Sequence, residues 1–220
     1  MRGMADSSNP PNPQSAIGNP KSEIRKPKSS LAIFVDRDGT LNEDIGYVSS
    51  PDQLVLYPWA GEAVRLINSS GRKAIVITNQ SGIARGLYTE DVLARIHSRM
   101  IEELSREGAR VDAVYYCPHH PVAGQPPYRR SCECRKPRTG MLETASIEHG
   151  IDLARSFVIG DKASDMELAA NAGARGVLVM TGYGSETLAH SERWPCKPAL
   201  IAENLLEAVK RILDSEVKQS

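Results

Sequence analysis

Six short apolar runs, rich in Val and Ile, alternate along this chain with segments of helical pattern. The runs lack a strict alternation of apolar and polar residues, which is typical of strands buried on both faces of a parallel sheet. Strand, helix, strand in repetition predicts one doubly wound α/β domain. The predicted strands are residues 31–35, 74–78, 112–116, 156–160, 176–180 and 198–202.

Helical segments fill the intervals, and several carry end signals. Thr89, Thr139 and Asn204 are each expected to cap the helix that follows. Glu207 and Arg211, four residues apart, are expected to pair on the last helix. The predicted helices are residues 61–70, 90–106, 140–149, 165–171 and 205–213.

The N-terminal residues 1–29 are rich in Pro, Ser, Asn and Lys and poor in large apolar side chains. Such a segment buries too little apolar surface to offset its ordering entropy, so we expect a disordered tail before one domain over residues 30–216. No apolar run reaches the roughly 18 residues of a membrane span, and none follows Arg2 as in a secretory signal. We therefore expect a cytoplasmic protein, and we expect a monomer because no apolar surface repeat stands out.

The charge balance limits the possible partners. Basic and acidic residues number 27 each, so the formal net charge is zero. Nucleic-acid-binding domains usually carry a basic excess, so nucleic acid is not an expected partner. An anionic small molecule would instead need a local positive cluster. Candidates for that cluster are Arg85, Arg129, Arg130, Arg135, Lys136 and Lys162.

Polar residues follow three predicted strands directly. Asp36 and Asp38 follow the first, Thr78 ends the second, and Asp161 follows the fourth. Because ligands bind at the carboxyl ends of parallel strands, these side chains are expected to converge. Carboxylates suit Mg²⁺, and a carboxylate that attacks phosphorus gives an aspartyl-phosphate. Each residue alone has an ordinary explanation as an Asx turn or helix cap, but together they indicate phosphate chemistry.

Residues 117–138 interrupt the alternating pattern with a Pro-rich loop that holds three cysteines and two histidines. In a reducing compartment, metal binding is expected more often than a disulfide. Cys117, Cys132 and Cys134, with either His119 or His120, would supply the Cys₃His set of a structural zinc site. The spacing leaves both histidines open, and free thiols or a disulfide are the alternatives.

The strand-end residues 36–40, 78–80, Lys136 and 160–162 resemble the four motifs of the haloacid-dehalogenase (HAD) superfamily. Within it the chain resembles the heptose-bisphosphate phosphatases, through residues 44–47, 78–86, 115–121 and 132–137. The resemblance spans roughly residues 31–182. It implies a Rossmann-like HAD fold without a large cap domain, and a seven-carbon sugar bisphosphate that loses its 7-phosphate.

The resemblance also implies a role for each residue. Asp36 is the implied nucleophile, Asp38 the general acid and base, and Thr78 and Lys136 the groups that stabilise the phosphoryl group. The implied Mg²⁺ ligands are Asp36, Asp161 and, through its backbone carbonyl, Asp38, and the implied Zn²⁺ ligands are Cys117, His119, Cys132 and Cys134. The implied substrate-binding residues are Asp44, Ile45, Gly46, Tyr47, Asn79, Gln80, Ser81, Arg135 and Lys162.

Other readings of the same residues predict different activities. A histidinol-phosphate phosphatase has a similar zinc loop, and a polynucleotide 3′-phosphatase would share the aspartate chemistry. A non-catalytic zinc module would not need aspartates at strand ends, and the P-loop pattern of many phosphotransferases is absent. Arg37 is assigned no catalytic role and is expected only to pair with solvent-facing carboxylates.

Overall fold

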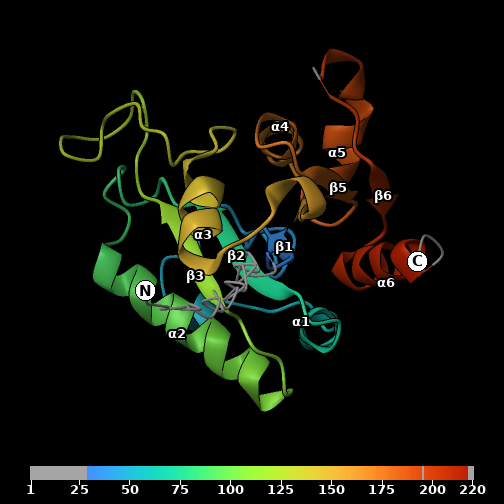
Figure 1. Ribbon diagram of the computed structural model, residues 1–220. Coiled ribbons are helices and arrows are strands. Elements are labelled where there is room, and N and C mark those ends of the chain that lie inside the picture. Colours follow the sequence, from blue (N-terminus) through green and yellow to red (C-terminus); the bar gives the residue numbers. More distant parts are fainter. Residues whose placement is uncertain (1–28, 195, 218–220) are drawn as a thin grey trace, which may run out of the picture.

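The computed structural model describes residues 29–194 and 196–217 (Figure 1). The predicted tail, apart from its last residue, lies outside these ranges. They form a single six-stranded sheet with helices on both faces, so the predicted doubly wound α/β class is confirmed. Among the residues described, no helix is both long and apolar enough to span a bilayer.

The strands are all parallel and lie in the order β3-β2-β1-β4-β5-β6. The chain order reverses between β1 (Ala32–Val35) and β4 (Phe157–Gly160), and ligands of open α/β sheets bind at such a switch point. Val35 pairs with Ile159 across it, so both strands end at the same level. The other strands are β2 (Lys73–Asn79), β3 (Ala113–Cys117), β5 (Arg175–Val179) and β6 (Leu200–Ala202).

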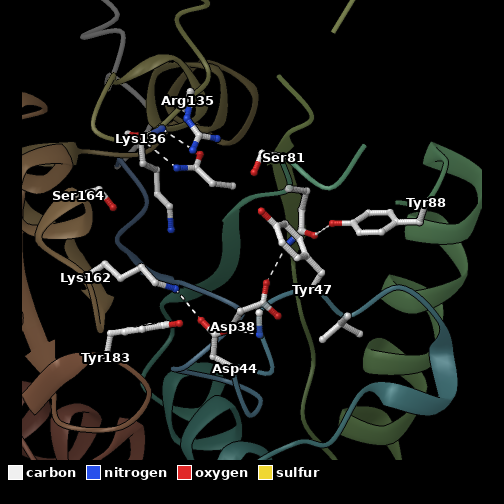
Figure 2. A pocket seen from close by; sticks show the side chains of 14 residues that line it. Asp38, Asp44, Tyr47, Ser81, Tyr88, Arg135, Lys136, Lys162, Ser164 and Tyr183 are labelled. Carbon is white, nitrogen blue, oxygen red and sulfur yellow. Dashed lines mark hydrogen bonds and ion pairs between the residues drawn. The ribbon is translucent and has the colours of Figure 1, made fainter. Parts of the chain in front are cut away.

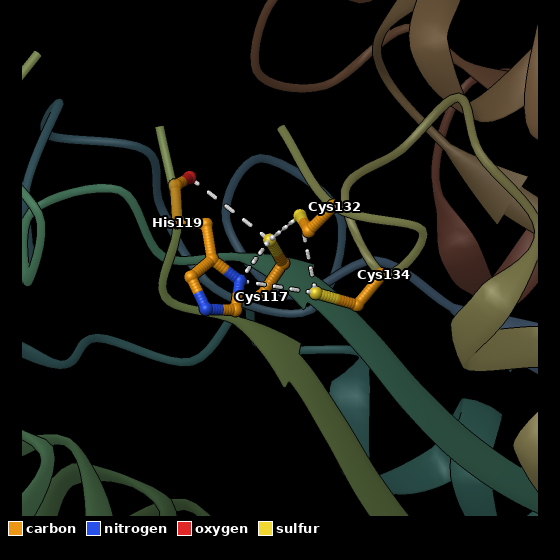
Figure 3. A group of neighbouring side chains, drawn as sticks. All are labelled: Cys117, His119, Cys132 and Cys134. Atoms are coloured by element: carbon orange, nitrogen blue, oxygen red, sulfur yellow. Dashed lines mark hydrogen bonds between the residues drawn. The ribbon is translucent and has the colours of Figure 1, made fainter. Parts of the chain in front are cut away.

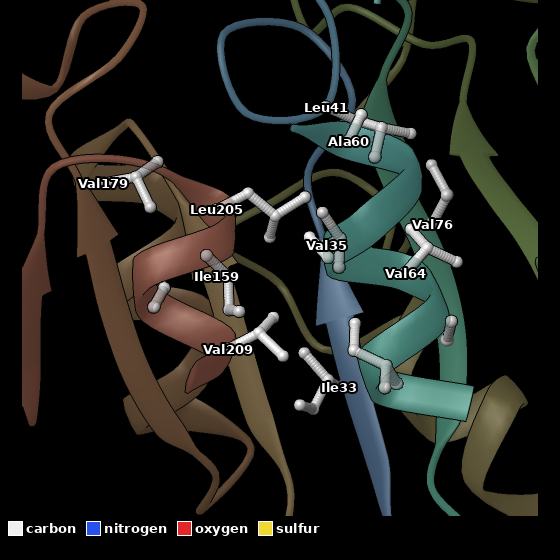
Figure 4. Packing of buried hydrophobic residues seen from close by; sticks show 14 of the residues in the cluster. Ile33, Val35, Leu41, Ala60, Val64, Val76, Ile159, Val179, Leu205 and Val209 are labelled. Atoms are coloured by element: carbon white, nitrogen blue, oxygen red, sulfur yellow. The ribbon is translucent and has the colours of Figure 1, made fainter. Parts of the chain in front are cut away.

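Two apolar cores lie on the two faces of the sheet. Ile33 and Val35 point toward α1 and α6 (Figure 4), whereas Ala32 and Phe34 pack on the side of α3 and α4, because successive strand residues face opposite ways. Helix α2 joins α1 and α6 on the first face. The helices are α1 (Ala60–Ser69), α2 (Glu90–Arg106), α3 (Gly140–His149), α4 (Ala163–Asn171), α5 (Gly184–Ala189) and α6 (Leu205–Val217).

The predicted helix ends are mostly confirmed. Thr89 accepts a hydrogen bond from the backbone N–H of Val92, and Asn204 caps α6 through the N–H of Glu207. The Glu207–Arg211 ion pair is present at 3.3 Å. The prediction for Thr139 is wrong, because its hydroxyl donates to the carboxylate of Glu143 and accepts no backbone N–H.

The sequence did not predict the shortest helices. Helix α5 and the one-turn helices η1 (Pro51–Gln53), η2 (Leu153–Arg155) and η3 (Ser191–Arg193) are too short to show a helical period. Helix α4 begins two residues before its predicted start, at Ala163. The observed strands end within one residue of their predicted ends.

Candidate active site

Three carboxylates meet where β1 and β4 end. Asp36 follows β1, Asp161 follows β4, and Asp165 lies in the first turn of α4. All three are buried, and one oxygen of each lies within 4.8 Å of the others. Burial is the largest cause that raises the pKa of Asp36 to about 6 and that of Asp161 to about 7. Carboxylates this close repel one another when they are charged. They therefore need a nearby cation if all of them are to be ionised at the same time.

The chemistry of this cluster fits Mg²⁺, which prefers carboxylate oxygens. Oδ1 of Asp161 is buried and has no hydrogen-bond partner among the described residues, while Oδ2 accepts from the N–H of Tyr183 at 2.8 Å. Gly39, at φ 87°, passes so close that a Cβ there would overlap the Asp161 carboxylate, so glycine is required. Asp36 and Asp161 therefore lie together as predicted ligands would. The carboxylate of Asp38 is not part of the cluster, and that of Asp165 is.

Lys136 supplies a positive charge beneath the cluster. Its Nζ lies 2.8 Å from Asp36 Oδ1 and 2.7 Å from Asp165 Oδ1, and it donates to the carbonyl of Ile77 at 3.2 Å. Burial lowers the pKa of Lys136, but the two carboxylates outweigh burial and raise it. The amide of Asn79 bonds to both the N–H and the carbonyl of Lys136, at 3.1 and 3.2 Å, so the end of β2 fixes the lysine backbone.

Asp38 is anchored by its neighbour in sequence. Nε and NH2 of Arg37 donate to the Asp38 carboxylate at 2.9–3.1 Å, and Asn42 donates to Oδ1 at 3.0 Å. Burial raises the pKa of Asp38, but the charge of Arg37 and these hydrogen bonds hold it below its ordinary value. Arg37 is fully buried, so the predicted solvent-facing pairing is wrong.

His97 supports Arg37 from helix α2. Its Nε2 lies 3.3 Å from NH1 of Arg37. Burial and the charge of Arg37 lower the pKa of His97 to about 3, so its imidazole is neutral and Nε2 accepts from the guanidinium. Helix α2 thus supplies a hydrogen-bond acceptor to the buried guanidinium group of Arg37.

Gln80 connects two of the predicted catalytic residues. Its Nε2 donates to Asp38 Oδ2 and to Thr78 Oγ1, each at 2.8 Å. Its Oε1 accepts a hydrogen bond from the hydroxyl of Tyr88, which is buried. Tyr88 therefore fixes the amide of Gln80, and Gln80 in turn orients Asp38 and Thr78.

A cavity of about 440 Å³ is lined by Asp38, Gln80 and Lys136 among others (Figure 2), whereas Asp36, Thr78 and Asp161 do not line it. Every predicted substrate-binding residue lines it except Ile45, whose side chain is half exposed. Ile45 sits next to a pocket residue in sequence but does not reach the cavity. The lining residues are Asp38, Asp44, Gly46, Tyr47, Val48, Asn79, Gln80, Ser81, Tyr88, Arg135, Lys136, Lys162, Ser164 and Tyr183.

An ion pair crosses one side of this cavity. Nζ of Lys162 lies 2.8 Å from Asp44 Oδ2 (Figure 2) and 4.9 Å from the ring centre of Tyr183. Burial lowers the pKa of Lys162, but Asp36, Asp161 and Asp44 together raise it. The lysine is therefore charged where a phosphate would enter. Tyr183 had no recognisable signal in the sequence, since it follows β5 in an unpatterned turn.

The predicted zinc ligands form a compact group (Figure 3). Sγ of Cys132 lies 3.5 Å from Sγ of Cys117 and 3.3 Å from that of Cys134, and Nδ1 of His119 lies 3.3 Å from Cys134 and 3.8 Å from Cys117. Around a tetrahedral zinc with bonds of about 2.3 Å, ligand atoms would lie about 3.8 Å apart. The group fits such an ion, and none of its cysteines forms a disulfide.

The same loop carries two cavity residues. Arg135 and Lys136 follow Cys134 directly, and NH1 of Arg135 donates to the carbonyl of His119 at 3.2 Å. His120 turns out of the sulfur cluster, and its Nδ1 accepts from the N–H groups of Val122 and Ala123. The cysteines of the cluster and the buried Lys136 therefore belong to one loop, which begins at the end of β3.

Known proteins resemble this chain over most of its length. A family model described as HAD-hydrolase-like matches residues 133–208. The D-glycero-D-manno-heptose-1,7-bisphosphate 7-phosphatase of Thermosynechococcus vestitus is 43% identical over 185 residues, which are 82% of this chain and 94% of the relative. The D-glycero-β-D-manno-heptose-1,7-bisphosphate 7-phosphatase of Escherichia coli K12 is 44% identical over 153 residues. These are 69% of this chain and 80% of that protein.

A solved structure agrees with these relatives. The D,D-heptose 1,7-bisphosphate phosphatase of B. bronchiseptica, complexed with magnesium and phosphate, aligns with a TM-score of 0.75 at 34% identity. The alignment covers 84% of this chain and 99% of that one. By sequence and by fold, this chain belongs to the heptose-1,7-bisphosphate 7-phosphatase family of HAD-like hydrolases.

Proposed function

We propose that the chain removes the 7-phosphate of D-glycero-D-manno-heptose 1,7-bisphosphate through a phosphorylated Asp36. One observation carries this: Asp36 directly follows β1 at the β1–β4 switch point, in contact with the ammonium group of Lys136 and clustered with the carboxylates of Asp161 and Asp165. A buried carboxylate that is held beside an ammonium group, with two further carboxylates that could share a metal ion, is suited to attack a phosphate.

In the first step, an oxygen of Asp36 forms a bond to phosphorus while the bond from phosphorus to the C7 oxygen breaks. The leaving oxygen takes a proton from Asp38. In the second step a water attacks phosphorus, its proton passes to Asp38, and the bond to Asp36 breaks. Phosphate and heptose 1-phosphate leave, and both aspartates return to their starting states.

Asp38 becomes protonated for the first step only when the substrate is bound. In the free protein Arg37, Asn42 and Gln80 all donate to its carboxylate and favour the ionised form. A phosphate dianion brought beside Asp38 opposes them, because a nearby negative charge raises the pKa of a carboxyl. Asp38 can then enter the first step protonated.

The remaining polar groups hold the phosphate and the sugar. Thr78 and Lys136 bind the phosphoryl oxygens, and Lys162 and Arg135 bind the substrate from the two sides of the cavity. Mg²⁺, held by Asp36, Asp161 and the backbone carbonyl of Asp38, would neutralise charge on the phosphoryl oxygens.

Zn²⁺ has a structural part in this proposal. Held by Cys117, His119, Cys132 and Cys134, it would give the Pro-rich loop one fixed shape. Lys136 follows the last of these ligands by two residues, so the metal would set where its chain enters the site. We take residues 30–216 as one catalytic domain that acts as a monomer in the cytoplasm.

A phosphate-release panel tests the proposal. Both anomers of heptose 1,7-bisphosphate, histidinol phosphate and a 3′-phosphorylated oligonucleotide are offered to the wild type and to Asp36→Asn. We expect turnover of a heptose bisphosphate by the wild type alone. Faster turnover of histidinol phosphate or of the oligonucleotide would assign a different substrate. Equal inactivity of both proteins on every compound would instead favour a non-catalytic zinc module.

A further inference from the structure

Tyr183 lies between the cavity of about 440 Å³ described above (the catalytic cavity) and a second cavity of about 330 Å³. The second cavity lies beside α5 and the start of α4. Lys162 and Tyr183 line both cavities, and no other residue lines both. The remaining residues that line the second cavity are Ala163, Glu186, Thr187, His190 and Trp194.

The backbone of Tyr183 is fixed at the carboxylate cluster. Its N–H donates to Oδ2 of Asp161 at 2.8 Å. The preceding residue, Gly182, has φ 54°, and a Cβ there would overlap the Asp161 carboxylate. The hydroxyl of Thr181 donates to the carbonyl of Gly39 at 2.6 Å, which attaches the same turn to the loop after β1. None of these contacts uses the side chain of residue 183, so a different side chain should leave Asp161 in place.

The ring of Tyr183 is positioned by an ammonium group. Nζ of Lys162 lies 4.9 Å from the ring centre, within the range in which an aromatic face attracts a cation. The same Nζ lies 2.8 Å from Oδ2 of Asp44. Figure 2 shows the ring edge-on beside both side chains. The ring is 45% exposed and yet has a defined place at the boundary of the catalytic cavity.

The two cavities differ in the chemistry of their linings. The catalytic cavity carries Arg135 and Lys136 in addition to Lys162, which suits an anionic substrate. In the second cavity Trp194 and Ala163 supply apolar surface, and the carboxylate of Glu186 would repel a phosphate. An uncharged aromatic group fits this second lining, because aromatic rings pack well against the rings of Trp and Tyr.

We propose that Tyr183 is a specificity-determining residue, whose ring closes the catalytic cavity against the second cavity and so excludes phosphate esters of aromatic alcohols. Without the ring the two cavities would join. The aromatic group of such an ester could then pack against Trp194, while its phosphate takes the place of the sugar phosphate. The ester would be cleaved in the same two steps, and the proton of Asp38 would pass to the oxygen of the aromatic alcohol. This role of Tyr183 rests on the proposed phosphatase activity and does not depend on which sugar is cleaved.

The test measures kcat/KM for 2-naphthyl phosphate, with heptose 1,7-bisphosphate as the reference substrate. In Tyr183→Ala the value for 2-naphthyl phosphate should rise by about tenfold or more, within the range that one apolar contact in a pocket contributes to specificity. Tyr183→Phe keeps the ring and should give the wild-type value. The Mg²⁺ concentration for half-maximal rate should be equal in the three proteins, because the N–H of residue 183 still donates to Asp161.

Two controls test where the aromatic group lies. Tyr47→Ala removes a similarly exposed ring that lines the catalytic cavity but not the second one, and it should not raise kcat/KM for 2-naphthyl phosphate. Adding Trp194→Ala to Tyr183→Ala removes the large aromatic surface of the second cavity and should abolish most of the gain. Thermal unfolding of every variant checks that it is folded.

The outcomes separate this role of Tyr183 from the proposed function. No gain in Tyr183→Ala, an equal gain in Tyr47→Ala, or a gain that persists without Trp194 would overturn the role of Tyr183. Turnover of heptose bisphosphate by the wild type would leave the proposed function in place in each of these cases. The expected gain without any turnover of heptose bisphosphate would support the role of Tyr183 and reject the proposed sugar. If neither compound is cleaved by any of the proteins, both proposals are wrong.

Discussion

Nζ of Lys136 lies 2.8 Å from Oδ1 of Asp36, and both side chains are buried. The pair joins the end of β1 to a loop one hundred residues later in the chain, so the proposed nucleophile and its counter-charge are held by two independent segments. A carboxylate in this position is fixed before any substrate binds. The ammonium group beside it would stabilise negative charge on a bound phosphoryl group.

Asp36→Asn should abolish phosphate release. The amide has nearly the shape of the carboxylate but is a far weaker nucleophile, so no phosphorylated intermediate forms. Zinc content, measured by elemental analysis, should equal that of the wild type because residue 36 does not contact the sulfur cluster. Residual turnover above about one thousandth of the wild-type rate would show that another group attacks phosphorus.

Lys136→Met should destabilise the protein strongly when Mg²⁺ is absent. Asp36 and Asp165 would then lie buried without their cation, a loss of about 3–5 kcal/mol in the free energy of unfolding for a broken buried pair. Mg²⁺ should restore part of this stability, since an ion that binds the folded state stabilises it. Urea unfolding with and without Mg²⁺ measures both effects.

The control for that change is Lys162→Met, whose lysine side chain is 37% exposed and therefore partly solvated. Its loss of stability should be much smaller, although substrate binding should weaken. Equal destabilisation by the two variants would contradict a special role for the Lys136 pair.

Cys132→Ser should lose zinc and, as a consequence, activity. Serine is a poor ligand for zinc, so the Cys₃His set would be incomplete and the loop before Lys136 would lose its fixed shape. Elemental analysis and kcat measure the two losses, and Cys196→Ser is the matched control because Cys196 lies outside the cluster. Full zinc content in Cys132→Ser would mean that the ligand set is wrong.

Much of this site could be predicted from the sequence because its groups directly follow strands. Asp36, Thr78 and Asp161 lie at or just after the ends of β1, β2 and β4, and a parallel sheet must bring such positions together. The fold class could be predicted from the alternation of strand and helix segments along the chain. Strands that lack alternating polar residues are covered on both faces of the sheet.

The rest depends on packing that no local pattern records. His97 points at Arg37 from a helix sixty residues later, and on its own helix it looks like an ordinary apolar-stripe position. Asp165 begins a predicted helix close to a strand end, but nothing in the sequence places it beside Lys136, which comes from the loop with the three cysteines. Ile45 belongs to the motif over residues 44–47, but its side chain is half exposed and does not line the cavity.

His97 should make the stability of the protein depend on pH. Its pKa is about 3 in the folded protein and about 6.5 when unfolded, so below pH 6.5 the unfolded chain binds a proton that the folded protein does not. The stability from the neutral imidazole is therefore complete above that pH and is lost as pH falls toward 3. His97→Gln cannot take up this proton, and its side-chain oxygen can still accept from Arg37. From about pH 7.5 to about pH 5, the free energy of unfolding of the wild type should fall by about 2 kcal/mol more than that of the variant.

Urea unfolding of both proteins across this range measures the difference, which cancels the titration of all other groups. Parallel pH profiles would mean that His97 takes up its proton as readily in the folded protein as in the unfolded chain, so that its ring could not accept from Arg37 at pH 5.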